Sequence, residues 1–173
     1  MSTLNRDLMT KPDFLTDEEW ERLKEQTASL DRIRGDAKAD VESYLANPDG
    51  RSKGIPPWGV PTLLLTHFGR KSGKPHITPL VFLKQGDEMF IVGSLAGYDE
   101  DPAWVKNLRA RPECKVQLDR EKTNASAREV TDSSEREALW PKLHQVFPSW
   151  YYFQHTTPRP FGIFALKSTG PAT

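Results

Sequence analysis

From residue 62 onward the chain consists of short apolar runs separated by turns, and this spacing constrains its fold more than any other feature. Short runs rich in apolar or alternating residues and bounded by turn residues predict strands. About six strands are expected, at residues 62–66, 76–83, 89–92, 114–118, 125–130 and 161–166. Short helical segments interrupt them. The order predicts an α+β protein that is mainly β, built as a small barrel with peripheral helices.

The first 60 residues have a different character. Thr16 and Glu19 form a capping-box pattern, and apolar residues then recur at helical spacing as far as Leu45. Gly35 is the expected break between two helices. Residues 47–60 are rich in Pro and Gly, which indicates a linker. We therefore expect a helical arm and linker over 1–60 and a barrel domain over 61–173.

Two more helices are expected inside the barrel domain. Residues 101–108 begin with Asp-Pro, which places proline at the first helical position. Residues 131–143 begin with a capping pattern and continue with apolar residues at helical spacing. Pro141 should kink this second helix or end its first segment near Trp140, because proline lacks the amide that continues the helix.

Composition restricts the class of protein. Lys plus Arg and Asp plus Glu both number 24, so the overall charge does not indicate nucleic-acid binding. The single cysteine, Cys114, fits a reducing compartment. Residues 1–11 lack the apolar core of a secretory signal. We expect a cytoplasmic protein without a nucleic-acid partner.

The segment from Gly69 to His76 concentrates positive charge in one tight turn. Arg70 and Lys71 lie between two glycines, and glycines allow backbone N–H groups to converge on an anion. A guanidinium adds a planar fork for phosphate or carboxylate. An ordinary charged hairpin tip explains the same residues and, for the turn taken alone, is the favoured interpretation.

Two other segments suggest a ligand site. Residues 93–97 are mostly small and follow a strand, so a flat ligand could lie on their backbone, although a plain connecting loop looks the same. In residues 147–153, five of seven side chains are aromatic. They could form a pocket wall or simply fill the core.

Several common sites are missing from the sequence. The basic turn is one residue short of a phosphate-binding P-loop, and no strand is followed by a dinucleotide-binding glycine pattern. The four histidines have no partner at metal-ligand spacing. No metal site is expected.

Six short motifs together resemble the deazaflavin-dependent nitroreductase family, whose members use the reduced coenzyme F420. They are LLTHFGRKSGKP at 64–75, TPL at 78–80, GSLAG at 93–97, DPAW at 101–104, NLRARP at 107–112 and WPKL at 140–143. Their order and spacing make the match specific. The resemblance implies a split β-barrel similar to that of FMN-binding oxidoreductases.

The resemblance also implies a cofactor site for F420, an 8-hydroxy-5-deazaflavin with an oligoglutamate tail. The tail would contact Arg70, Lys71 and Ser72, and the linker and ring would lie along His76, Ile77, Thr78, Pro79, Leu80 and Val81. The ring edge would meet Val92, Gly93, Ser94 and Leu95, and further contacts would come from Ala103, Trp104, Val105, Lys106 and Asn107. Trp150 falls where the family has a tyrosine near the ring.

In such an enzyme the cofactor supplies a hydride and the protein supplies orientation. Quinones, activated enones and nitroaromatics would suit as acceptors. The chain has Phe147, Trp150 and Phe153 where better-known relatives have tyrosines, and Leu95 where a lysine is familiar. These changes argue against reduction of nitro drugs and favour a bulkier, more apolar acceptor. The catalytic candidates are Trp150, Ser149, Tyr151 and Tyr152.

Two alternatives remain open at this point. The chain could be a cofactor-binding or carrier protein with little turnover, or a relative that binds FMN or haem. The N-terminal arm could cap the pocket, pair with a second copy or touch a membrane. Its charged face is mixed, so a role within the molecule or in a homodimer ranks above weak membrane association.

Overall fold

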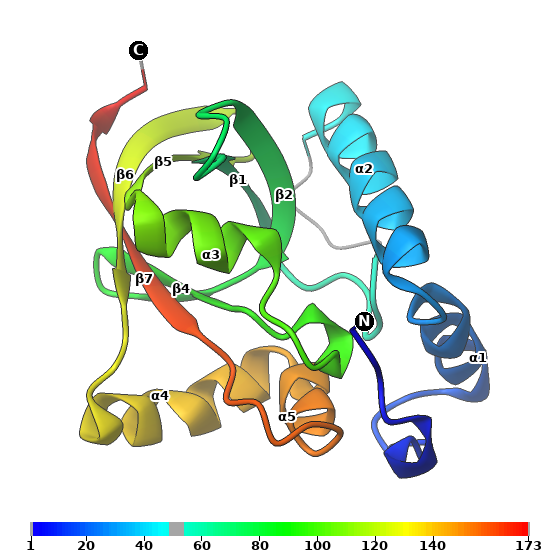
Figure 1. The fold of residues 1–173 in the computed structure, drawn as a ribbon. Coiled ribbons are helices and arrows are strands. Elements are labelled where there is room, and N and C mark those ends of the chain that lie inside the picture. The colour runs from blue at the N-terminus through cyan, green and yellow to red at the C-terminus, as the bar shows by residue number, and fades with distance from the viewer. Residues whose placement is uncertain (1, 49–53, 173) are drawn as a thin grey trace.

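The computed structural model describes residues 2–48 and 54–172. Seven strands form one antiparallel sheet in the order β2-β1-β5-β6-β7-β4-β3, and the sheet curls into an incomplete barrel (Figure 1). The strands are β1 (Thr62–Phe68), β2 (Pro75–Val81), β3 (Leu83–Gln85), β4 (Glu88–Val92), β5 (Glu113–Leu118), β6 (Glu121–Glu129) and β7 (Ile163–Pro171). The expected mainly β split barrel is confirmed.

The barrel is split where the sequence predicts one continuous strand. Residues 76–83 were expected as a unit, but β2 pairs with β1 at one edge of the sheet and β3 pairs with β4 at the other. The chain changes edges at Phe82, whose side chain is buried in the core. A local pattern of apolar residues cannot show this change, because both halves are extended and bury the same kind of side chain.

Two strands differ in length from the expectation. β6 begins at Glu121 rather than Ala125, directly after a tight turn in which Asp119 has a positive φ of 53°. β7 continues to Pro171 because its polar second half still pairs with β6. Both extensions consist largely of polar residues, which is why the apolar pattern missed them.

The N-terminal helices lie differently from the expectation. The helices are η1 (Arg6–Leu8), α1 (Asp17–Gln26), α2 (Leu30–Ala46), η2 (Leu95–Gly97), α3 (Ala103–Ala110), α4 (Ser133–Val146) and α5 (Pro148–Gln154). The Thr16 capping box is confirmed. The break at Gly35 is wrong: Gly35 lies inside α2, and the chain turns before Ser29, whose hydroxyl accepts the Arg32 N–H. A cap decides the boundary here, and the helix tolerates one glycine.

Proline has different effects in the two later helices. α4 continues through Pro141 to Val146, so the predicted end near Trp140 is wrong. Packing of Leu139 and Leu143 into the core keeps both sides of the proline in one helix. In α3, Pro102 is the N-cap rather than the first helical residue, and the helix ends before Pro112 as expected.

Two clusters of buried side chains hold these elements together. One fills the barrel and the face covered by α3, where Trp104, Val105 and Leu108 meet Leu63 and Leu65 of the barrel. The other lies between the sheet and α4 and α5. Leu15 and Leu23 of the N-terminal arm belong to this second cluster. The arm therefore shares a core with the barrel, and the proposed domain boundary at residue 60 remains a prediction.

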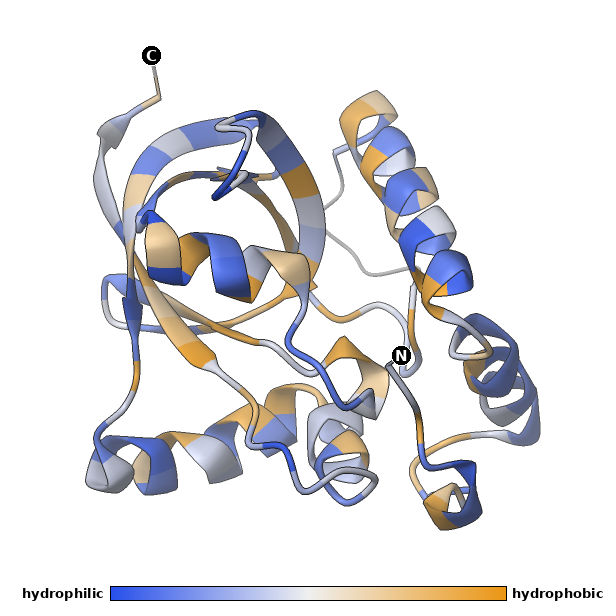
Figure 2. Ribbon diagram, viewed as in Figure 1, coloured by the Kyte–Doolittle hydropathy of each residue, from blue (hydrophilic) through white to orange (hydrophobic). Residues whose placement is uncertain are grey.

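α2 runs alongside β2 (Figure 1) and carries both apolar and charged faces (Figure 2). Tyr44 is its one buried side chain, and its hydroxyl donates to the Thr62 carbonyl and accepts the Asp119 N–H. Residues 49–53, part of the predicted turn and linker, lie outside the described residues. None of the helices in the described ranges is long and apolar enough to span a bilayer.

Candidate active site

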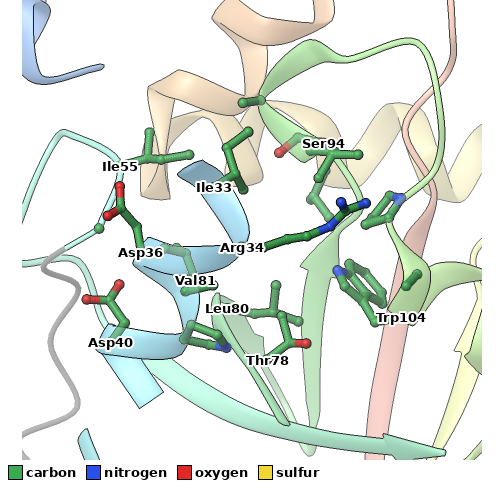
Figure 3. Close-up of a pocket in the computed structure, with 18 of the residues that line it drawn as sticks. Ile33, Arg34, Asp36, Asp40, Ile55, Thr78, Leu80, Val81, Ser94 and Trp104 are labelled. Carbon is green, nitrogen blue, oxygen red and sulfur yellow. The ribbon is translucent and has the colours of Figure 1, made fainter. Parts of the chain in front are cut away.

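A cavity of about 570 Å³ lies between α2 and the barrel (Figure 3). On one side it is bounded by β2, the loop of residues 93–101 and the start of α3, which we call the barrel wall. On the other side α2 forms the helical wall. Cavities of roughly 300–1,000 Å³ are typical of small-molecule sites. The fold therefore offers room for a cofactor and part of a substrate.

Most residues predicted to bind the cofactor line this cavity. They are Arg70, His76, Ile77, Thr78, Pro79, Leu80, Val81, Val92, Ser94, Leu95, Ala103, Trp104, Lys106, Asn107 and Trp150. Lys71 and Ser72 lie outside it on the exposed turn. Gly93 and Val105 are buried behind the wall, where a Cβ on Gly93 would meet Val105 Cγ2 at 2.6 Å. The glycine thus permits α3 to pack closely on β4.

The basic turn is closed by its own backbone. The Gly69 N–H donates to the Lys74 carbonyl at 2.9 Å, and the Gly73 N–H donates to the Gly69 carbonyl at 2.7 Å. These two amides are consequently not available as the anion nest that the sequence suggested. The side chain of Arg70 remains at the cavity, whereas that of Lys71 is directed to the exposed turn surface.

A buried network anchors Arg70. Asn107 Oδ1 accepts from the Arg70 N–H at 3.1 Å and from its guanidinium at 3.2 Å. This fixes the amide orientation, so Asn107 Nδ2 donates to His67 Nδ1 at 3.0 Å. His67 Nε2 therefore carries the proton and donates to the Thr78 hydroxyl at 3.0 Å. Burial, with a smaller effect of His76, lowers the pKa of His67 to about 4, so the imidazole is neutral at pH 7.

The 93–101 loop is held by one guanidinium. Arg159 donates to the carbonyls of Gly93 at 3.0 Å, Ser94 at 2.8 Å and Tyr98 at 2.9 and 3.0 Å. It also pairs with Asp101 at 3.0 Å. Burial lowers the pKa of Arg159, and Asp101 opposes that shift. A planar fork with several fixed donors suits such a set of carbonyls.

The same loop has an unusual backbone. Leu95 and Ala96 have φ angles of 44° and 51°, and Gly97 follows at 82°. Left-handed conformations are costly for side chains with a Cβ, and they persist where the surroundings enforce them. A Cβ on Gly97 would meet Thr156 Oγ1 at 2.1 Å, so only glycine fits there. The Arg159 hydrogen bonds hold the loop in this conformation, in which it presents Ser94 and Leu95 to the cavity.

Helix α5 directs its aromatic residues to different places. Trp150 and Phe147, the residue just before the helix, line the cavity and meet edge to face with ring centroids 5.4 Å apart. Ser149 is fully buried, and its hydroxyl donates to the Pro56 carbonyl at 2.6 Å. Its hydroxyl is thus used to fix the segment before β1.

The two tyrosines of α5 lie away from the cavity. Tyr151 is exposed and stacks on His144 with ring centroids 4.5 Å apart, and His155 meets the same ring at an angle, also at 4.5 Å. The Tyr152 ring meets the edge of Trp20 on α1 at 6.2 Å. Of the four catalytic candidates, only Trp150 lines the cavity. The helical period explains the separation, because neighbouring residues on a helix point in different directions.

Sequence reasoning missed three parts of the site. The roles of His67 and Arg159 are revealed only by their long-range contacts, since neither belongs to a pattern that indicates them. The third part is the helical wall, to which α2 contributes Ile33, Arg34 and Lys38. The helical spacing of apolar residues at 33, 37 and 41 predicted a buried face but not what it would cover.

The cavity combines a charged rim with an apolar wall. The rim includes Arg70 and Lys106, and Lys106 is paired with Glu100 at 3.1 Å. The carboxylates of Asp36, Asp40 and Asp101 also line the cavity. The apolar wall is formed by Leu80, Val81, Leu95, Trp104 and Trp150. A ligand with a flat ring and an anionic tail fits this division, because aromatic surface packs on the wall and the tail meets the cations.

Comparisons with known proteins show the family. Residues 39–168 match the family described as F420H(2)-dependent quinone reductase. The chain belongs to this family. The F420H(2)-dependent quinone reductase Rv1261c of Mycobacterium tuberculosis is 30% identical over 112 residues, which cover 64% of this chain and 75% of that protein. Rv3178 of the same species, whose name assigns it provisionally to this activity, is 33% identical over 108 residues, 62% of this chain and 90% of that protein.

Two solved structures are similar to this chain. The F420-H2 dependent reductase FDR-A is 29% identical, with a TM-score of 0.57 over 61% of this chain and 93% of that chain. A structure described as a domain-swapped dimer is 27% identical, with a TM-score of 0.59 over 75% of this chain and 96% of that chain. The resemblance to F420-dependent reductases is confirmed, and the family match does not favour the carrier, FMN or haem alternatives.

Proposed function

We propose that this member of the F420H(2)-dependent quinone reductase family reduces quinones with F420H2. The observation that carries the proposal is the cavity that joins the anchored Arg70 to an apolar end lined by Trp150. Bound F420H2 supplies a hydride, and the protein's task is to orient the cofactor and acceptor and to limit water.

The barrel wall would hold the cofactor. Arg70 binds the anionic tail, with Lys106 on the same rim. Thr78 and the 93–101 loop line the path from the tail to the ring. The strands and the Arg159 contacts make this wall rigid, and a rigid wall lowers the cost of ordering the site when the ligand binds.

The acceptor would lie toward Trp150 and Phe147. Both rings are apolar and line the cavity, so a quinone with an aromatic or aliphatic body packs against them. Enones and nitroaromatics are further candidate acceptors of the same site. Since the hydroxyls of Ser149, Tyr151 and Tyr152 lie elsewhere, we expect solvent to supply the final proton.

Assembly and location are part of the proposal. The structural relative described as a domain-swapped dimer supports a homodimer, which light scattering would detect. We also propose a cytoplasmic enzyme that meets lipid quinones by weak surface contact. Flotation with quinone-containing liposomes tests that contact, and a protein that stays wholly in the dense fraction would contradict it.

Two measurements test the function. F420 titration should show saturable binding, and F420H2 should be oxidised over many turnovers with menadione. Binding without turnover would return the chain to the carrier alternative. Binding of FMN or haem in place of F420 would overturn the cofactor assignment.

A further inference from the structure

The helical wall carries a charged side chain that the cofactor assignment does not use. Arg34 lines the cavity, and Figure 3 shows its side chain reaching from α2 across the space toward Trp104 and Ser94. Arg34 also precedes residues 39–168, the part of the chain that matches the family. Arg34 therefore lies in the N-terminal arm, outside the matched residues.

The Arg34 guanidinium is available to a ligand. Its side chain is 69% exposed, because the cavity opens to solvent. Within the described residues its one ion pair is a long contact of 3.5 Å to Asp31, which is itself 96% exposed. By contrast, Arg70 is held by Asn107, and Lys106 pairs with Glu100. A weak, exposed pair costs little to exchange for a ligand contact.

We infer that Arg34 binds the acceptor and stabilises the negative charge that reduction places on its oxygen. The inference rests on the proposed function. The proposed cofactor contacts lie on the barrel wall, opposite α2. An acceptor bound over the deazaflavin ring would therefore meet Arg34, which projects from α2. Addition of a hydride to a quinone transfers two electrons and one proton and leaves a hydroquinone monoanion, which takes its second proton from water.

A guanidinium suits this charge. It stays protonated at all working pH values, so it stabilises an oxyanion without competing as an acid. Its planar fork can donate two hydrogen bonds to the acceptor oxygen that receives the negative charge. Donors placed where charge develops contribute more to the transition state than to the ground state. Loss of Arg34 should therefore lower kcat/KM for the acceptor more than it weakens the binding of F420.

The first test compares Arg34→Met with Arg22→Met. Arg22 lies on α1 and pairs with Glu25, and neither residue lines the cavity. We expect Arg34→Met to lower kcat/KM for menadione about 10- to 100-fold, the loss of one charge-assisted hydrogen bond, and to leave the Kd for F420 within about twofold. Arg22→Met should change neither. An equal loss in F420 affinity would assign Arg34 to the cofactor, and an unchanged kcat/KM would remove it from the site.

The second test does not depend on turnover. The oxidised F420 complex is titrated with 2-hydroxy-1,4-naphthoquinone, an anion at neutral pH, and with its neutral 2-methoxy analogue. The wild type should prefer the anion, Arg34→Met should lose the preference and Arg34→Lys should retain part of it. Equal preference in wild type and Arg34→Met overturns the inference. If F420H2 is not oxidised by quinones but the preference is found, the proposed function fails while Arg34 remains an anion-binding residue.

Discussion

The two walls of the cavity are held in different ways. The barrel wall is fixed by strand pairing, by the five Arg159 hydrogen bonds and by the Asn107 network. The helical wall rests on apolar packing and, at its far end, on the Tyr44 hydroxyl. A wall fixed by many directional bonds suits a constant ligand such as a cofactor. A wall held by packing and exposed ion pairs can adapt to different acceptors.

The largest effect should follow from removing the Arg159 guanidinium, which holds the 93–101 loop of the barrel wall. Arg159→Met leaves four carbonyl contacts without their donor in a mostly buried place, so we expect a loss of about 3 kcal/mol in unfolding free energy. F420 binding should fall with it. Urea unfolding and F420 titration measure both effects. Arg159→Lys should restore little of the stability or of the F420 binding, because an ammonium lacks the planar fork. Full restoration would contradict the role given to the Arg159 hydrogen bonds.

A smaller effect is expected from the network behind the basic turn. Asn107→Ala removes the acceptor that orients Arg70, so cofactor binding should weaken by about 1–3 kcal/mol. Arg70→Ala should have an effect of similar size, and Lys71→Ala a smaller one, because Lys71 does not line the cavity. Fluorescence titration of F420 ranks the three variants. A larger effect of Lys71 than of Arg70 would show that the tail follows the outside of the turn.

The buried histidine makes the stability of the barrel wall depend on pH. The pKa of His67 is lowered from 6.5 to about 4, so the unfolded chain takes up a proton before the folded one. Stability should therefore decrease as the pH falls from about 6.5 to 4, by up to about 3 kcal/mol. His67→Gln should flatten this decrease in chemical denaturation at several pH values. An NMR titration that places the pKa of His67 near 6.5 would contradict the account.

The smallest effect concerns the helical wall. Gly35 lies inside α2, and a methyl group added there would meet no atom within 4 Å, so Gly35→Ala should stabilise the protein by about 0.5–1 kcal/mol. Turnover should be unchanged if the helix acts as a continuous wall. A large loss of turnover with raised stability would instead identify Gly35 as a hinge. Thermal unfolding and menadione reduction provide the two readings.

The same contrast explains what the sequence could predict. The strands, the basic turn and the small-residue loop are local features, and most of the residues chosen from them, from Thr78 to Asn107, line the cavity. The contacts that stiffen the wall join residues far apart, such as Arg159 with Ser94 and His67 with Asn107, and no local pattern reports them. The position of Ser149, Tyr151 and Tyr152 depends on how α5 is rotated, which adjacency in sequence does not reveal.

Hydrogen exchange in two steps tests the division between the walls most directly. Addition of F420 should slow exchange in residues 64–81 and 92–108 and leave residues 30–46 nearly unchanged. Addition of a quinone to the oxidised F420 complex should then slow exchange in residues 30–46. Protection of α2 by F420 alone, with no further change on adding the quinone, would contradict the account.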